Sequence, residues 1–272
     1  MARRAIDGPL LGFLFRRHRL ATGLCYVVPV LIGLVVGFLY PTYAPQREAL
    51  KVFKYATRFL GQGQMDLFSA EGAFSLPFQH PLCLLALGLA AALAPLALPA
   101  GERGRGALDL LLASPLERGT LVRTLVLHEF LVALGVGAAS LIGAWSGAMW
   151  AGESGTLTPE RYLVLTALVA SLALALGAIA SWISVEARDR GQAALVYGVA
   201  MGVFFILDVA ARMWRDGEWL GWLTPFGYLR PARILTTEDL ASVAGRDLGV
   251  LLAVATVGFG LAIARQARRR SA

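Results

Sequence analysis

The chain has 272 residues, of which 57% are hydrophobic and 16% are charged. With a mean hydropathy of +0.63, it is too apolar for an ordinary soluble domain, so this class is excluded. The formal net charge of +7 comes from arginines clustered beside apolar runs, which favours the positive-inside bias of membrane proteins over nucleic-acid binding. The composition therefore predicts an integral membrane protein.

Residues 1–19 combine five arginines with apolar residues such as Leu10, Phe13 and Leu14. This pattern is typical of a helix that lies on the cytoplasmic membrane surface, with its arginines among lipid phosphates. A basic tail that only sets the topology is the alternative interpretation. The apolar run that follows is too long for a cleaved signal peptide, and no small-residue cleavage site ends it.

Six apolar runs are each near the length of roughly 20 residues that a helix needs to cross the bilayer core. They are approximately Leu20–Tyr40, Phe78–Leu98, Leu121–Met149, Tyr162–Ile183, Gln192–Met213 and Leu248–Ala264. Because backbone polar groups in lipid must be satisfied internally, we expect six helices and no open sheet. The predicted fold class is an all-α membrane protein, with residues 1–272 forming a single transmembrane domain.

The segment 41–77 separates the first two runs and contains a second amphipathic pattern. One helical face collects Leu50, Phe53, Thr57 and Leu60, and the other collects basic residues. We expect a helix on the outer membrane surface, which acts either as a structural lid or as a gate for an exit path.

A charged amphipathic segment, residues 101–119, joins the second and third runs. Leucines recur at helical spacing on one side of it, while Arg105 and Asp109 lie one turn apart on another. Ser114 should end this helix, since a residue before proline is disfavoured in the α region, and Ser114-Pro115 then starts the next helix. We therefore predict a helix, a break and a second helix that continues into the membrane.

This segment resembles the coupling region between the second and third helices of ABC-2 permeases, the membrane subunits of ATP-binding cassette (ABC) exporters. The matching residues are Glu102, Arg103, Gly106, Ala107, Leu108, Asp109, Leu110, Leu111, Leu112, Pro115, Leu116 and Arg118. The chain departs from the family pattern in two places. Glu117 stands where a hydroxyl residue is usual, and His128 and Glu129 replace a Gly-Lys pair, which can change the partner surface that is recognised. An ordinary amphipathic loop is the alternative.

The resemblance implies that the segment forms a coupling helix docked on a separate ATP-binding subunit. It also implies a second, smaller contact at the short turn 184–191. The implied interface comprises Glu102, Arg103, Gly106, Leu108, Asp109, Leu111, Leu112, Pro115, Arg118, Glu186 and Arg188. Two copies of the partner subunit are expected, with ATP and Mg²⁺ bound there. No cofactor is expected in this chain.

The distribution of basic residues predicts the topology. An even number of spans puts both termini on one side, and fifteen of the 25 lysines and arginines fall on that side. Because positive charges are enriched in cytoplasmic loops, both termini and the 101–119 segment should be cytoplasmic. The expected location is the cytoplasmic membrane of a prokaryote.

The loop from Trp214 to Asp247 is rich in aromatic residues and prolines. Its aromatic residues, Trp214, Trp219, Trp222, Phe226 and Tyr228, suit the outer membrane interface, and Pro225 and Pro231 break any long helix. The sequence LTPFGYLRPARIL also resembles the stretch before the last span of ABC-2 permeases. An ordinary aromatic belt is the alternative.

Small residues recur every four positions in several runs, which lets helix backbones approach closely. The stripes are Gly33 and Gly37; Ala139, Gly143 and Gly147; Ala173, Gly177 and Ser181; and Gly198 and Gly202. They pack either within the chain or against a second copy. Since six helices are half of the usual exporter complement, the resemblance implies a permease dimer, identical or mixed.

Charged residues within the runs are few. Asp208 has Arg212 four positions later, where an ion pair would reduce the cost of burial. Glu129 lies about two turns after Arg123 in the third run. Both acids are candidates for function, although structural pairing is the simpler interpretation.

Enzyme classes find little support in the sequence. His128-Glu129 begins like the HExxH pattern of zinc proteases, but Val132 stands in place of the second histidine. Lys51 and Lys54, the chain's two lysines, lie outside any GxxxxGKS/T phosphate loop, so the chain does not supply a P-loop ATPase. The cysteines, Cys25 and Cys83, fall in separate spans.

The sequence thus predicts a non-catalytic permease subunit that couples ATP hydrolysis by a separate subunit to export of an unidentified substrate. Its expected partners are the ABC ATP-binding subunit, a second permease copy and membrane lipid, without nucleic acid. The alternative is a membrane scaffold or sensor that recruits a cytoplasmic partner through the same segment without transport.

Overall fold

The computed structural model describes residues 6–46, 68–104 and 118–268, and all regular elements in this part of the chain are helices. The long helices are α1 (Gly8–Tyr43), α5 (Pro81–Ala97), α8 (Arg118–Ala151), α9 (Pro159–Glu186), α10 (Arg190–Met213) and α12 (Leu240–Arg268), and two short helices, α3 (Ala70–Phe74) and α4 (Leu76–Gln79), precede α5. The other short elements are η1 (Ala44–Gln46), α6 (Pro99–Gly104), η3 (Ser154–Thr156), η4 (Arg215–Leu223), η5 (Pro225–Tyr228) and α11 (Pro231–Thr236). Among the described residues, six helical stretches are long and apolar enough to cross a membrane, which confirms the predicted fold class.

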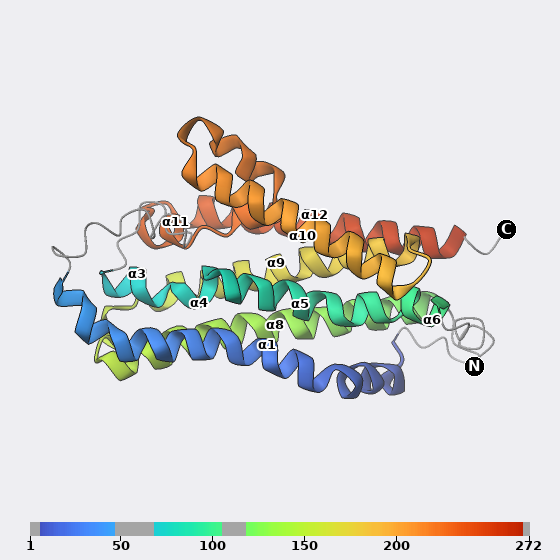
Figure 1. Cartoon of the computed structure of the whole chain (residues 1–272), viewed down its shortest axis with the longest axis horizontal. Coiled ribbons are helices and arrows are strands. Elements are labelled where there is room, and N and C mark those ends of the chain that lie inside the picture. The colour runs from blue at the N-terminus through green and yellow to red at the C-terminus, as the bar shows by residue number, and fades with distance from the viewer. Residues whose placement is uncertain (1–5, 47–67, 105–117, 269–272) are drawn as a thin grey trace.

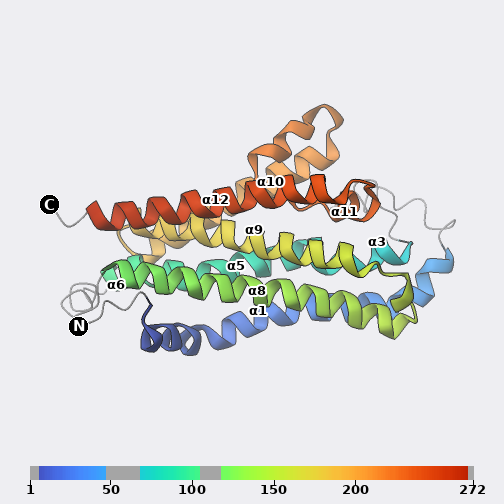
Figure 2. The same cartoon turned by 180° about the vertical axis from the view of Figure 1, so that it is seen from behind.

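The six stretches form an elongated bundle (Figures 1 and 2). The start of α1, α6, the start of α8, the turn between α9 and α10 and the end of α12 gather at one end, which we call the elbow end. Helices α3 and α11 lie at the opposite end. The chain therefore enters and leaves the bundle on the side that carries the predicted coupling segment.

Within the described residues, the segment predicted to form an interfacial helix, residues 1–19, is continuous with the first span. Helix α1 runs without a break from Gly8 to Tyr43, and the side chain of Asp7 caps it by accepting a hydrogen bond from the Leu10 amide at 2.7 Å. The Asp7 amide in turn donates to Thr124 Oγ1 at 3.0 Å, which fixes the start of α1 to α8. Figures 1 and 2 show its first turns bent away from the line of the rest of the helix.

The second span is divided into three helices. Pro77 and Pro81 lie in the first turns of α4 and α5, where a missing amide proton is tolerated. The breaks are closed by local contacts, since Ser75 Oγ donates to the Gly72 carbonyl at 2.7 Å. Expected to begin at Phe78, this span instead starts in the structure at Ala70, because α3 and α4 extend it at the end opposite the elbow end.

Glycines bring α1 and α8 into backbone contact. A Cβ atom added to Gly33 would collide with the carbonyl of Gly143, and one added to Gly37 would collide with that of Gly147. These two predicted stripes therefore pack against each other within the chain, as close backbone approach requires.

Helix α9 occupies the centre of the bundle and contacts α5, α8, α10 and α12. Its leucines at positions 165, 168, 172 and 176 are fully buried, as expected for a helix that is apolar on all sides. Helix α10 lies at the periphery, where Gly198 and Gly202 face open space. This stripe does not pack within the described chain.

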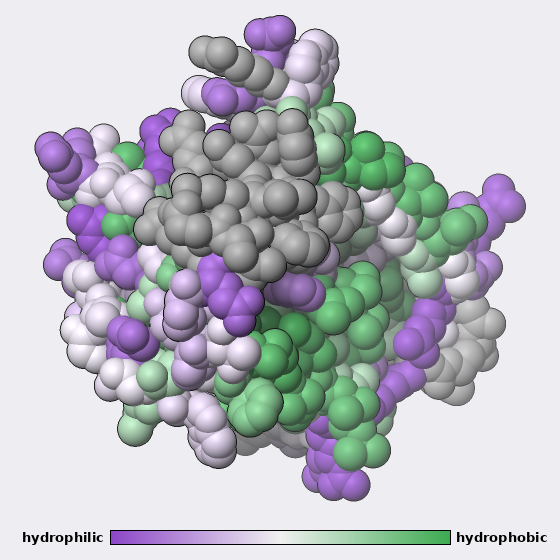
Figure 3. All heavy atoms as spheres, turned by 60° about the vertical axis from the view of Figure 1, so that its left-hand side comes forward, coloured by the Kyte–Doolittle hydropathy of each residue, from purple (hydrophilic) through white to green (hydrophobic). Residues whose placement is uncertain are grey.

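The flank of the bundle is apolar. Figure 3 shows green side chains over the middle of the visible flank and purple ones toward the ends. Large hydrophobic residues on α1 and α10, such as Leu20, Leu24, Leu195 and Ile206, are among the most exposed of the chain. Such a surface is stable in contact with lipid and would be costly in water.

Candidate functional site

The two segments predicted to contact an ATP-binding subunit begin side by side at the elbow end. The Ala100 amide of α6 donates to Ser184 Oγ of α9 at 3.1 Å, and both residues are fully buried. Gly101 lies against the side chain of Arg190, the first residue of α10. The start of the 101–119 segment is therefore anchored on the 184–191 turn, although 84 positions separate Ala100 from Ser184.

A shared apolar cluster supports this junction. It contains Ala92, Leu96, Ala100, Ala180, Ile183, Ala187, Ala193 and Tyr197, from α5, α6, the end of α9 and the start of α10. Tyr197 also donates to the Gly88 carbonyl at 2.8 Å. Because protein interiors are close-packed, a displacement of α6 would press on the α9–α10 turn.

Part of the predicted interface can be placed in the structure. Glu102 and Arg103 belong to α6, and Arg118 is the first residue of α8. The remaining residues of this segment, Gly106, Leu108, Asp109, Leu111, Leu112 and Pro115, lie outside the described residues. The coupling helix therefore stays a prediction, while its two flanking helices are in place.

Glu186 and Arg188 lie at the turn between α9 and α10. Arg265 of α12 donates from Nε to Glu186 Oε1 at 2.7 Å. The Arg188 amide donates to Gln192 Oε1 at 2.8 Å, and Asp189 caps α10 by accepting from the Gln192 amide at 2.9 Å. Sequence reasoning missed the contact of Arg265 with Glu186, because 79 positions separate the two residues.

A polar cluster lies inside the bundle, on the elbow side of α8. His128 Nδ1 and Glu129 Oε1 are 3.0 Å apart, with both side chains about 1% exposed. The Phe15 ring of α1 packs on the His128 ring, with centroids 4.6 Å apart. Glycine at position 177 of α9 makes room for the carboxylate, since an added Cβ would be 2.9 Å from Glu129 Oε2. Glu129 therefore contacts the adjacent His128 and not Arg123, which lies about two turns earlier in α8.

Asp208, the other acidic residue within the predicted spans, contacts Arg212, the partner that its spacing predicts. Asp208 Oδ2 accepts from Arg212 Nε at 2.9 Å, and the acid is 2% exposed. Arg212 also reaches the Leu229 carbonyl at 3.5 Å. This ion pair therefore ties α10 to the loop that follows it.

The loop between α10 and α12 is held by arginines that donate to backbone carbonyls. Arg161 of α9 donates to the carbonyls of Ile234 and Thr237 at 2.7 and 2.8 Å. As expected, Pro225 and Pro231 lie in the first turns of η5 and α11. One aromatic residue departs from the predicted belt, because Phe226 is buried in the core whereas three tryptophans of the loop are exposed.

Hydrophobic helices, an apolar flank and junctions built from buried polar contacts define a polytopic α-helical membrane protein. A family model described as "ABC-2 family transporter protein" matches residues 15–265. The chain therefore belongs to the ABC-2 transporter family, whose members are non-catalytic membrane components that work with a separate ABC ATP-binding subunit. Comparison with curated proteins and with solved structures gave no match.

Proposed function

We propose that this chain is the permease subunit of an ATP-driven exporter, and that the 101–119 segment together with the 184–191 turn receives movement from a separate ATP-binding subunit. The observation that carries the proposal is the junction of α6 with the α9–α10 turn through Ala100 and Ser184. A partner that docks on both segments would press on the ends of α5, α9 and α10 at once.

For ATP to drive this movement, it must bind two arrangements of the partner subunits with different affinities. ATP must stabilise one arrangement of the two partner subunits more strongly than the other, because equal affinity for both shifts no population. The ATP-binding subunit would be present in two copies, and ATP and Mg²⁺ would bind there. A second permease copy, identical or homologous, would complete the pathway, with both termini in the cytoplasm of a prokaryotic cell.

Copurification from native membranes tests the proposed coupling segment. The test variant combines Asp109→Ala, Leu111→Ala and Arg118→Ala. Its matched control combines Arg215→Ala, Asp216→Ala and Leu223→Ala, which removes the same residue types from η4. We expect a P-loop ATPase to copurify with the native chain and the control, and to be lost from the test variant.

The ATPase activity of the copurified complex separates transport from scaffolding. Stimulation by a lipid or hydrophobic compound supports an exporter, whereas partner binding without stimulation supports the scaffold or sensor. If neither the native chain nor the control retains an ATPase while both remain folded in detergent, the proposed function is wrong.

A further inference from the structure

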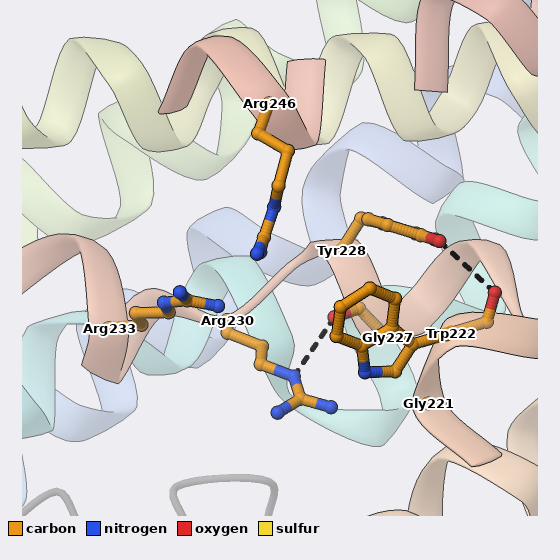
Figure 4. A pocket seen from close by; sticks show the side chains of 7 residues that line it. All are labelled: Gly221, Trp222, Gly227, Tyr228, Arg230, Arg233 and Arg246. Carbon is orange, nitrogen blue, oxygen red and sulfur yellow. Dashed lines mark hydrogen bonds between the residues drawn. The ribbon is translucent and has the colours of Figure 1, made fainter. Parts of the chain in front are cut away.

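The loop between α10 and α12 encloses a small cavity with an arginine-rich wall. Its volume is about 30 Å³, and Arg230, Arg233 and Arg246 line it together with Trp222 and Tyr228. Figure 4 shows the side chains of Arg233 and Arg246 turned toward a common space, with the Trp222 ring on its other side. The three arginines come from the residue before α11, from α11 itself and from α12.

Two glycines allow the cavity to form. A Cβ atom on Gly227 would collide with the Gly221 carbonyl, and a Cβ on Gly221 would collide with Nη2 of Arg230. Only residues without side chains let the two backbone segments and this guanidinium meet. The cavity is therefore a product of the local sequence and not a gap left by poor packing.

Two of the arginines are held in place by the protein. Arg230 donates from Nε to the Gly227 carbonyl at 2.9 Å. Arg246 donates from Nε and Nη2 to Asp247 Oδ1 at 2.9 and 2.6 Å, and it lies 5.7 Å from the centre of the Trp222 ring. Arg230 and Arg246 are thereby oriented before a ligand binds, so binding costs little side-chain conformational entropy at these two residues.

Positive charge at the cavity exceeds the nearby negative charge. Asp247 is engaged by Arg246, and Asp208 is engaged by Arg212. Within the described chain, the guanidinium of Arg233 has no hydrogen-bond or ion-pair partner. Burial, with help from neighbouring Arg212, lowers the pKa of Arg230, although Asp208 and Glu218 act in the opposite direction. An anion in the cavity would relieve this crowding of like charges.

We propose that this cavity binds a phosphate-type oxyanion. Planar guanidinium groups match phosphate oxygens and form charge-assisted hydrogen bonds with them. The cavity has room for water-sized groups such as phosphate oxygens, while the rest of a larger ligand would remain outside. Trp222, which lines the cavity, and Trp219 and Leu223 of the same helix η4 have exposed side chains, which are suited to the membrane interface, where lipid phosphates lie. Both a lipid headgroup and free phosphate carry this chemistry.

Thermal unfolding of the purified full-length chain in detergent tests the site. The probes are phosphatidylglycerol, phosphatidylcholine and inorganic phosphate, each titrated at constant ionic strength. The main variant is Arg233→Gln, since its side chain makes no described contact whose loss would disturb the fold. Arg230→Gln is the second variant, and Arg47→Gln/Arg58→Gln controls for a general loss of positive charge.

A ligand that binds the folded state raises the unfolding temperature in a concentration-dependent way. We expect phosphatidylglycerol to stabilise the native chain and the control more than phosphatidylcholine does. Arg233→Gln should weaken this binding about tenfold, the loss expected for one charge-assisted contact. The effect should shrink at high salt.

The remaining outcomes separate the sources of the ligand or overturn the proposal. If inorganic phosphate also raises the unfolding temperature of the native chain but not of Arg233→Gln, the site accepts free phosphate. If phosphate has no effect, the lipid headgroup is the source. The proposal is wrong if neither anion stabilises the native chain more than phosphatidylcholine does, or if Arg233→Gln and Arg230→Gln both respond like the control.

Discussion

Arg265, near the end of the last helix, donates to Glu186 at the end of α9, across 79 positions of the chain. Because both side chains are substantially exposed, the ion pair contributes little to stability, typically below about 1 kcal/mol. Its position beside the proposed partner contact gives it a different significance. It connects the 184–191 turn to the C-terminal helix, so both can respond to the same docking event.

Reversing the charge of Glu186 should therefore affect coupling more than folding. For Glu186→Arg we expect a nearly unchanged unfolding temperature, but an about fivefold loss of the lipid- or compound-stimulated ATPase activity of the copurified complex, within the usual range of coupling energies. The double variant Glu186→Arg/Arg265→Glu restores the ion pair and should recover most of the activity. Glu160→Arg, at the other end of the same helix, is the matched control. Equal activity of Glu186→Arg and this control would show that the ion pair has no part in coupling.

The contact between α1 and α8 predicts opposite effects for two similar substitutions in α1. Gly33→Ala places a methyl group against the Gly143 carbonyl, and overpacking of this kind costs about 1–3 kcal/mol. Gly23→Ala meets no atom within 4 Å and removes a residue with low helix propensity, so it should be neutral or slightly stabilising. Heating followed by size-exclusion chromatography measures both. A Gly33→Ala variant that survives heating as well as Gly23→Ala would contradict the backbone contact.

Much of the fold could be predicted because lipid imposes a simple requirement. An apolar run of about 20 residues must be helical in a bilayer, so the sequence located all six spans. The ends were less predictable. Nothing in the local pattern says that the segment before residue 20 joins the first span in one helix, or that α3 and α4, Ala70 to Gln79, extend the second span.

The arrangement of the polar residues could be predicted only in part. The Asp208–Arg212 ion pair followed from spacing along one helix, since residues four positions apart are neighbours. The Glu186–Arg265 and Ala100–Ser184 contacts link distant parts of the chain, and no sequence period encodes them. Glycine stripes indicate close approach but do not identify the partner helix, which for Gly33 depends on how α1 packs against α8.

Glu129 should be replaceable by an isosteric amide but not by an apolar residue. In Glu129→Gln a hydrogen bond to the His128 ring can be kept, and the unfolding temperature should remain close to that of the native chain. Glu129→Leu leaves buried His128 Nδ1 without its present partner, which costs about 1–3 kcal/mol. Glu153→Leu, in the loop before η3, controls for the loss of one acid. If Glu129→Leu and Glu153→Leu unfold at the same temperature, the buried contact contributes nothing to stability.

The Asp208–Arg212 ion pair provides a double-mutant cycle at the junction of α10 with its following loop. Asp208→Ala removes the carboxylate that accepts from the mostly buried Arg212 guanidinium, and breaking a buried pair of this kind costs about 3–5 kcal/mol. Arg212→Ala removes the arginine that donates to the buried Asp208 carboxylate and also removes the contact with the Leu229 carbonyl, so it should be at least as destabilising. The double variant Asp208→Ala/Arg212→Ala removes both charges and should be more stable than either single variant. Denaturant unfolding in mixed micelles measures the three differences in free energy. Additive losses, with the double variant the least stable, would mean that the two side chains do not interact and that the loop is held by other contacts.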